Sequence, residues 1–393
     1  MTSFQIAQVE FSRPAVATWR SQDEKHGNWP VVYVLDNYGY TGGRNSNSVL
    51  RDIYVGESLN AVSRLRQHLE TPAKQHLKNA RVILHEKYNK SVCLDLESYL
   101  IRMIAGDGAN QVLNRNNGIT DAQYYQREAY RAGFRTVFEQ LKSDGMFTRS
   151  VPETENSSLF KLSPYKAPTE DQADSVEEIL TRFFVDLSTG GRSKIVIQGD
   201  PGTGKTVVAI YLIKLLVDIA ALNSLDDLDS DSRFFGFFTA ANQRLLQDCR
   251  IGLVVPQQSL RDTIKDVFRK TRGLHPDVVM TPFQVGEADG IFDLLIVDDT
   301  HRLNQRANQP SGVLNGKFTI ITRELFGSDD FSKTQLDWIT AKGSCSQVSF
   351  PIRVQRASIS SSALKCAYKR VRILCLTFDG SLIRTPSRSR EHD

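Results

Sequence analysis

The chain has 393 residues, of which 40% are hydrophobic and 24% are charged. This length predicts two or three domains, and the composition is typical of folded protein, which excludes a wholly disordered chain. The sequence shows no signal peptide and no charge-free apolar run of membrane-spanning length, so we expect a cytoplasmic protein with no membrane partner. The five cysteines show no paired spacing typical of a disulfide framework or a zinc ribbon.

The net charge of +4 is distributed unevenly along the chain. Residues 345–393 carry nine Lys and Arg against three acidic residues, which leaves the preceding residues near −2. The body of the protein is therefore not a strongly basic nucleic-acid-binding surface, and any such binding must come from local patches.

A small α/β domain is predicted over residues 1–147. Short apolar stretches at residues 31–36, 52–57 and 80–88 predict strands, and apolar periodicity predicts an amphipathic helix before Pro72 and another over residues 93–106. Residues 148–170 are rich in Ser, Pro, Thr and Glu with little periodicity, which predicts a flexible linker.

A second α/β domain is predicted over residues 171–344, where helical patterns alternate with short, wholly apolar strands such as KIVIQ and FDLLIV. Strands of this kind are typical of a parallel sheet covered by helices on both faces. After residue 345 the sequence loses its periodicity. Residues 345–393 are therefore predicted to form an atypical basic tail, for which disorder is the simpler account.

The strongest motif is GDPGTGKT, at residues 199–206, between an apolar strand and an amphipathic helix. Its glycines let backbone N–H groups surround phosphate oxygens at the helix N-terminus. Lys205 would reach the β and γ phosphates of ATP, and the Thr206 hydroxyl would be a ligand of Mg²⁺. The residues expected to bind the nucleotide and its metal are Gln172, Gly199, Asp200, Pro201, Gly202, Thr203, Gly204, Lys205, Thr206 and Asp298.

The segment FDLLIVDDTHRL predicts the acidic partner of this loop at the end of a strand. Asp298 would hold Mg²⁺ through water and Asp299 would orient the attacking water, although either could instead be a plain helix cap. The segment resembles the DEAH-type box of helicase ATPases, with Asp299 and Thr300 in place of the usual Glu and Ala. The Asp side chain is one methylene shorter than Glu, which would slow the activation of water without removing it. Gln172 resembles the adenine-reading Gln of helicases, with a solvated helix start as the alternative.

Together, Gln172, the phosphate-binding loop, VVMTP and IVDDTHRL resemble the first RecA-like lobe of the Schlafen-group-3-like DNA/RNA helicase family, over residues 165–344. The resemblance implies ATP, Mg²⁺ and DNA or RNA as ligands. Such motors need a second lobe, and the roughly 50 residues after 344 are too few to form one. Their Ser, Arg and Cys bias would fit a frameshifted or prematurely ended reading frame.

A second set of residues lies in the first domain. Tyr33 and Tyr54 lie on predicted strands, and Arg64 and His68 lie one turn apart on the helix after the second strand. Glu97 lies on a later helix and Asn114 follows it. This order resembles a GIY-YIG endonuclease over residues 30–118, which implies a small α/β domain with a short antiparallel sheet.

The resemblance implies that the catalytic residues are Tyr33, Tyr54, Arg64, Glu97 and Asn114, with His68 as an accessory. Glu97 would bind a single Mg²⁺ or Mn²⁺, Arg64 would contact the scissile phosphate, and a Tyr would orient or deprotonate the water. The motifs depart from the family pattern in reading Val-Val-Tyr and Tyr-Val-Gly. Asn117 rivals Asn114, and each residue alone is typical of a solvated helix or a core tyrosine.

The expected function is ATP-linked processing of DNA or RNA by a nuclease joined to a helicase-like lobe. One alternative is a nuclease whose lobe only binds nucleotide as a regulatory switch. Another is a truncated protein that binds ATP and nucleic acid without turnover. The sequence leaves open the choice between DNA and RNA and the oligomeric state.

Overall fold

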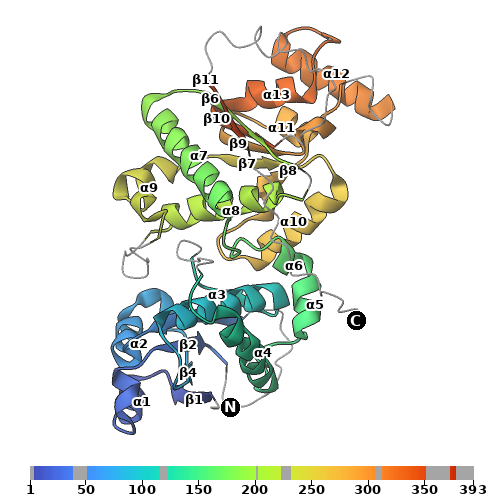
Figure 1. The fold of residues 1–393 in the computed structure, drawn as a ribbon. Coiled ribbons are helices and arrows are strands. Elements are labelled where there is room, and N and C mark those ends of the chain that lie inside the picture. The colour runs from blue at the N-terminus through green and yellow to red at the C-terminus, as the bar shows by residue number, and fades with distance from the viewer. Residues whose placement is uncertain are drawn as a thin grey trace, which may run out of the picture. The chain divides into compact units, whose positions relative to one another are not determined.

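The computed structural model describes residues 4–38, 51–115, 123–200, 202–222, 232–305, 312–350 and 372–377, of which 198, 344–350 and 372–377 are described by their backbone alone. The chain forms two compact units (Figure 1). The first comprises Met1–Ala167, Ile213–Phe238 and Thr263–Pro276, and the second comprises Pro168–Leu212, Thr239–Asp262 and Asp277–Asp393. No helix in the described part of the chain is long and apolar enough to cross a membrane.

The first unit is built on a mixed five-stranded sheet in the order β1-β4-β2-β3-β5. Its strands are β1 (Gln5–Glu10), β2 (Val31–Asp36), β3 (Arg51–Ser58), β4 (Asn79–Leu84) and β5 (Asn110–Val112). Neighbouring strands are antiparallel except for β3 and β5, which are parallel. The β2–β3 register places Tyr33 opposite Gly56. The expected short antiparallel sheet is thus present, with one parallel edge strand added to it.

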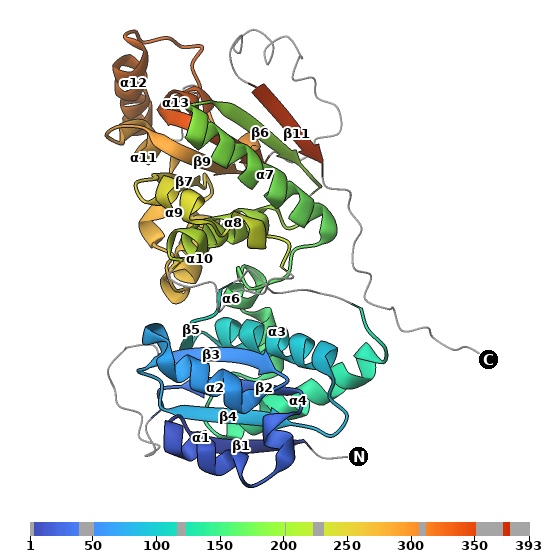
Figure 2. The same cartoon turned by 90° about the vertical axis from the view of Figure 1, so that its left-hand side faces the viewer.

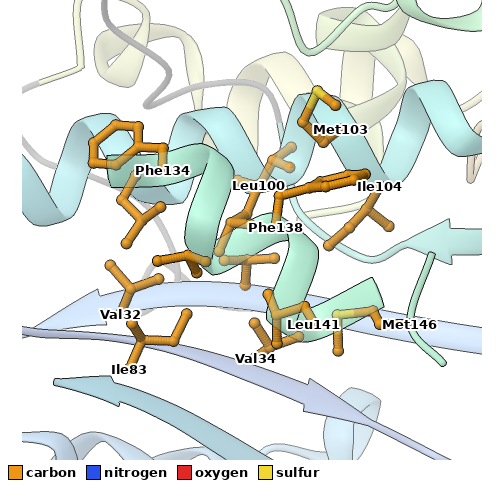
Figure 3. Packing of buried hydrophobic residues seen from close by; sticks show 14 of the residues in the cluster. Val32, Val34, Ile83, Leu100, Met103, Ile104, Phe134, Phe138, Leu141 and Met146 are labelled. Atoms are coloured by element: carbon orange, nitrogen blue, oxygen red, sulfur yellow. The ribbon is translucent and has the colours of Figure 1, made fainter. Parts of the chain in front are cut away.

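Strand β2 is buried along its whole length, so helices cover both faces of this sheet. Val32 and Val34 pack with α3 (Lys90–Asp107) and α4 (Arg127–Ser143), as Figure 3 shows. Val31, Tyr33 and Leu35 belong to a second cluster with residues of α1 (Arg13–Arg20) and α2 (Ala61–Glu70). Two 3-10 turns complete this side, η1 (Glu24–Gly27) and η2 (Pro72–Lys74).

The segment expected to be a linker contains two short helices, α5 (Val151–Asn156) and α6 (Ser158–Lys161), which both contact α3. The segment thus has regular structure packed on α3, which its composition did not indicate. The polar residues that indicated a linker form caps instead. Ser150 and Glu153 make a capping box at the start of α5, and Val151 is buried.

The second unit contains a six-stranded sheet in the order β11-β6-β10-β9-β7-β8, and every pairing in it is parallel (Figures 1 and 2). This confirms the predicted parallel sheet. The strands are β6 (Ser193–Gln198), β7 (Ile251–Val254), β8 (Val279–Met280), β9 (Phe292–Asp298), β10 (Gly343–Phe350) and β11 (Arg372–Thr377). The α-helices of the segments between and around them are α7 (Glu170–Thr189), α8 (Lys205–Ala220), α9 (Ala240–Leu246), α10 (Gln258–Lys270), α11 (Pro282–Glu287), α12 (Gly312–Phe326) and α13 (Gln335–Lys342).

Two strands extend beyond the predicted end of the second domain. Strand β10 crosses residue 344 and pairs with both β6 and β9. Strand β11 lies within the predicted tail and pairs with β6. Strand β10 has the polar sequence GSCSQVSF, which hides it from an apolar pattern, whereas β11 has the short apolar run ILCL inside a segment of basic and Ser-rich composition. The remaining residues of the tail, and the domain boundaries themselves, stay predictions.

We expect Asp95→Asn to destabilise the protein by about 3–5 kcal/mol, because it leaves the buried Arg127 without its carboxylate. Asp95 and Arg127 are 7% and 5% exposed, and Arg127 Nε lies 3.0 Å from Asp95 Oδ2. Burial opposes the charge of Asp95, but hydrogen bonds from Arg127 and Arg131 outweigh it and lower the pKa of this carboxyl. The stabilisation is therefore present above the unfolded-state pKa of about 4 and is lost as the pH falls.

Urea denaturation of the full chain at pH 7 and pH 3 measures this difference. The difference in the free energy of unfolding between wild type and Asp95→Asn should be larger at pH 7 than at pH 3. Glu70→Gln is the matched control, because it removes the partner of an exposed arginine, Arg13, and should cost less than about 1 kcal/mol. Equal destabilisation by Asp95→Asn and Glu70→Gln would contradict a stabilising role of the buried Asp95–Arg127 pair.

Candidate functional site

The phosphate-binding loop connects the carboxyl end of β6 to the start of α8 in the second unit. Gly202 and Gly204 have φ angles of +84° and +82°, which glycine adopts without strain. The buried Lys205 folds back over the loop, and its Nζ donates to the carbonyl oxygens of Gly199 at 2.8 Å and Asp200 at 2.9 Å. Burial lowers the pKa of Lys205. Pro201 lies outside the described residues.

Thr206 and Asp298 meet although they are 92 residues apart in sequence, and Thr206 Oγ1 donates to Asp298 Oδ2 at 2.7 Å. Asp298 is the last residue of β9 and is 1% exposed. Burial raises the pKa of Asp298 to about 6, and the Thr206 hydrogen bond only partly opposes this shift. A hydroxyl and a carboxylate are hard oxygen ligands of the kind Mg²⁺ prefers, so these residues fit the metal of an ATP complex.

Asp299 adopts a left-handed backbone conformation, with φ +50° and ψ 50°, at the start of η5 (Thr300–Arg302). Aspartate tolerates this conformation better than most residues because its side chain can form local hydrogen bonds. Its Oδ2 lies 3.3 Å from Arg302 Nε. The structure thus places Asp299 beside Asp298, with Arg302 as an ion-pair partner that sequence reasoning missed.

Gln172 lies in the first turn of α7, where it forms a capping box with Thr169. Its Nε2 donates to the carbonyl oxygen of Thr203 in the phosphate-binding loop at 2.8 Å. A side chain on Gly204 would come within 2.9 Å of this Nε2 atom. Gln172 therefore supports the loop from outside, and its reading of adenine stays a prediction.

The site of the first unit is organised around Tyr33, which is fully buried in the β2–β3 pair. Its ring lies against Gly56, where any Cβ atom would overlap the tyrosine hydroxyl. Tyr54, which is 8% exposed, lies beside it with ring centroids 6.4 Å apart. The tyrosine on one strand therefore requires the glycine on the next.

His68, which the sequence analysis ranked as an accessory, is fully buried on α2. Its Nε2 lies 2.8 Å from Tyr33 Oη, and its Nδ1 lies 3.0 Å from Nζ of Lys74. Lys74 belongs to η2, is 4% exposed, and places its Nζ 3.5 Å from the centroid of the Tyr54 ring. Sequence reasoning missed Lys74. The available signal was Pro72, since a proline after a helix predicts a turn that redirects the next residues.

Arg64 and Glu97 are the partly exposed members of this site. Burial raises the pKa of Tyr33 well above its usual value, and the nearby Tyr54 and Glu97 add to the shift. Arg64 opposes it through its charge and a side-chain hydrogen bond to Tyr33. The Arg64 guanidinium also donates to Gln67 Oε1 at 2.6 Å. Arg64 and Glu97 therefore act electrostatically on the same phenol from different helices.

Asn114 is placed by the structure against the backbone of β3. Its Nδ2 donates to the carbonyl oxygen of Val55 at 2.7 Å, and its Oδ1 accepts from the N–H of Val55 at 3.0 Å. Both ends of the amide extend the sheet, which supports a structural role at this position. Asn117, its rival, lies outside the described residues.

Residues 192–323 match the family model of the Schlafen group 3, DNA/RNA helicase domain. The match begins before β6 and ends within α12, and it includes the phosphate-binding loop, Asp298 and Asp299. It covers about a third of the chain and supports a nucleic-acid-processing ATPase at the level of the family. No curated protein matches the chain. The match does not include the site around Tyr33, so any function of that site is argued from its geometry alone.

We expect Gly56→Ala to destabilise the protein by about 1–3 kcal/mol, because the new methyl group would overlap Tyr33. Gly133→Ala is the matched control. Nothing lies within 4 Å of a Cβ at this exposed position of α4, so the change should stabilise the helix by about 0.5–1 kcal/mol. Thermal denaturation of both variants measures the two effects, and a neutral Gly56→Ala would exclude the close packing of Tyr33 on Gly56.

Proposed function

We propose that this chain is an ATP-binding, nucleic-acid-processing protein whose second unit is a helicase-like ATPase lobe. The observation that carries the proposal is the contact between Thr206 and Asp298 beside Lys205. It joins the two halves of an ATP·Mg²⁺ site at one edge of a parallel sheet, where such folds bind ligands. The family match over the same residues supports it.

Each side chain has a distinct part in this proposal. The loop N–H groups would hold the phosphates, and Lys205 would leave its two carbonyl acceptors to reach the β and γ phosphates. Thr206 and Asp298 would hold Mg²⁺, which would supply charge neutralisation at the phosphates. Asp299 would orient the attacking water if ATP is hydrolysed. A lobe that binds ATP as a switch without hydrolysis is the alternative, because the Asp299 carboxylate is short for that role.

We expect Lys205→Ala to weaken ATP binding about 10- to 100-fold, because it removes a charge-assisted contact worth about 1.5–3 kcal/mol. Titration with a fluorescent ATP analogue in Mg²⁺ measures the affinity. Lys317→Ala is the control, since this exposed lysine pairs with Glu287 elsewhere in the same unit. Equal loss in the two variants would rule out the phosphate-binding loop as the binding site.

ATP hydrolysis with and without DNA or RNA then separates a motor from a switch. Turnover that depends on Lys205 and rises with nucleic acid supports the ATPase lobe. Tight binding without turnover supports the nucleotide switch, or a protein that binds ATP and nucleic acid without turnover.

We further infer that the first unit is a metal-dependent endonuclease of the GIY-YIG type. The supporting observation is the convergence of Tyr33, Tyr54, Arg64 and Glu97 from two strands and two helices. Phosphodiester cleavage needs positive charge at the phosphorane, which Arg64 would supply. It also needs a divalent ion, which Glu97 would hold with water and phosphate oxygens as the other ligands. Mg²⁺ or Mn²⁺ would activate the attacking water.

We expect Arg64→Ala and Glu97→Ala each to lower the rate of plasmid cleavage by at least about 10²-fold, because each removes stabilisation of the transition state. The assay uses the full chain with Mg²⁺ or Mn²⁺. Arg66→Ala on the exposed side of α2 and Glu128→Ala on α4 are the matched controls and should cut like wild type. If Glu97→Ala cut as fast as wild type, another site or a contaminant would be the nuclease.

A further inference from the structure

We propose that Lys74 is a positioning residue that fixes the tautomer of His68 and, through His68 and Tyr33, the orientation of Arg64. This inference rests on the proposed nuclease function of the first unit. Lys74 would not contact the substrate. Its effect would pass through the buried chain Lys74–His68–Tyr33 to the partly exposed guanidinium.

The turn after α2 brings Lys74 back beneath that helix. Helix α2 ends at Glu70, and Pro72 starts the 3-10 turn η2. The N–H of Lys74 donates to the carbonyl oxygen of Thr71 at 2.9 Å, which closes the turn. A lysine is seldom this deeply buried, so its 4% exposure indicates a specific environment.

One contact of Lys74 is typical of a charged lysine. The ammonium lies 3.5 Å from the centroid of the Tyr54 ring, whose negative face attracts a cation. An ammonium group is a hydrogen-bond donor with no acceptor. At 3.0 Å from Lys74 Nζ, His68 Nδ1 must therefore accept.

The proton of the neutral imidazole then lies on the other nitrogen. The hydrogen bond made by one ring nitrogen determines which tautomer is present. With Nδ1 accepting from Lys74, Nε2 carries the hydrogen and donates to Tyr33 Oη at 2.8 Å. A doubly protonated ring would point an N–H at the ammonium and is disfavoured by like charge.

Tyr33 Oη consequently accepts from His68 as well as from Arg64. If His68 adopted the other tautomer, its unprotonated Nε2 would instead accept a hydrogen bond from the hydroxyl of Tyr33. The hydroxyl of Tyr33 would then rotate about its C–O bond. This rotation would reorient the lone pairs that accept the hydrogen bond from Arg64, and the guanidinium would have to move with them. Tyr54, Arg64 and Glu97, which lie on β3, α2 and α3, act electrostatically on this phenol, and the ammonium of Lys74 on η2 lies over the Tyr54 ring.

The test reads the tautomer directly by long-range ¹H–¹⁵N NMR on the full chain with labelled histidine. The signals of His68 are assigned by their loss in His68→Gln. Wild type is expected to show a protonated Nε2 and an unprotonated Nδ1. Lys74→Met, which keeps the chain length but removes the donor, is expected to shift His68 toward the Nδ1–H form.

The kinetic readout is plasmid cleavage, resolved into kcat and KM. Lys74→Met is expected to lower kcat about 10²-fold with a smaller change in KM, since a small misplacement of a phosphate-contacting group has effects of this size. Lys74→Arg keeps a cation that can only donate hydrogen bonds. It should therefore keep the Nε2–H tautomer of His68 and most of the wild-type cleavage rate. Lys78→Met, at an exposed lysine four residues along the chain, should match wild type in both readouts.

Two results would overturn the proposal: an Nδ1–H or doubly protonated His68 in wild type, or a wild-type tautomer and rate in Lys74→Met. The first needs no variant, so it decides the matter even if Lys74→Met does not fold. A wild-type chain without Glu97-dependent cutting would instead refute the nuclease function, and the NMR signals would still test the link between Lys74 and His68.

Discussion

The antiparallel pairing of β2 with β3 is the constraint on which the site of the first unit depends. It places the Tyr33 ring over the one residue of β3 that has no side chain. A slip of one residue would move Tyr33 to the opposite face of the sheet and away from His68. Helix α2 follows β3 directly, with Asn60 as its N-cap, so the strand register also fixes where Arg64 and His68 lie.

In the second unit, the parallel pairing of strands likewise determines where the site residues lie. The carboxyl ends of β6 and β9 lie at one edge of the sheet with β10 between them, which brings the phosphate-binding loop to Asp298. Burial works against the charge of Asp298 and of Lys205 alike. A bound divalent cation would favour the ionised carboxylate, and a phosphate would favour the ammonium. The proposed ATP·Mg²⁺ complex would therefore offset the cost of burying both charges.

The sequence predicted those parts of the molecule that depend on local pattern. Apolar runs predicted the parallel sheet, and the glycine spacing predicted the loop before Lys205. Composition was a weaker guide, because the Ser and Glu residues that suggested a linker are also helix-capping residues. Lys74 could not be found from periodicity, which describes the faces of a helix and says nothing of how the chain turns after it. The burial of His68 likewise depends on how α2 packs on the sheet, and α2 alone does not determine that packing.

The burial of the two tyrosines bears on how the proposed nuclease would divide its work. Tyr33 is fully enclosed, whereas Tyr54 keeps 8% of its surface exposed, and Arg64 and Glu97 are both partly exposed. A group that orients the attacking water must reach that water, which favours Tyr54 over Tyr33 for this role. Tyr33 instead has the contacts of a supporting residue, because its hydroxyl interacts with both His68 and Arg64. The first tyrosine would then hold the arginine in place while the second faces the reaction, and the glycine opposite Tyr33 makes room for that support.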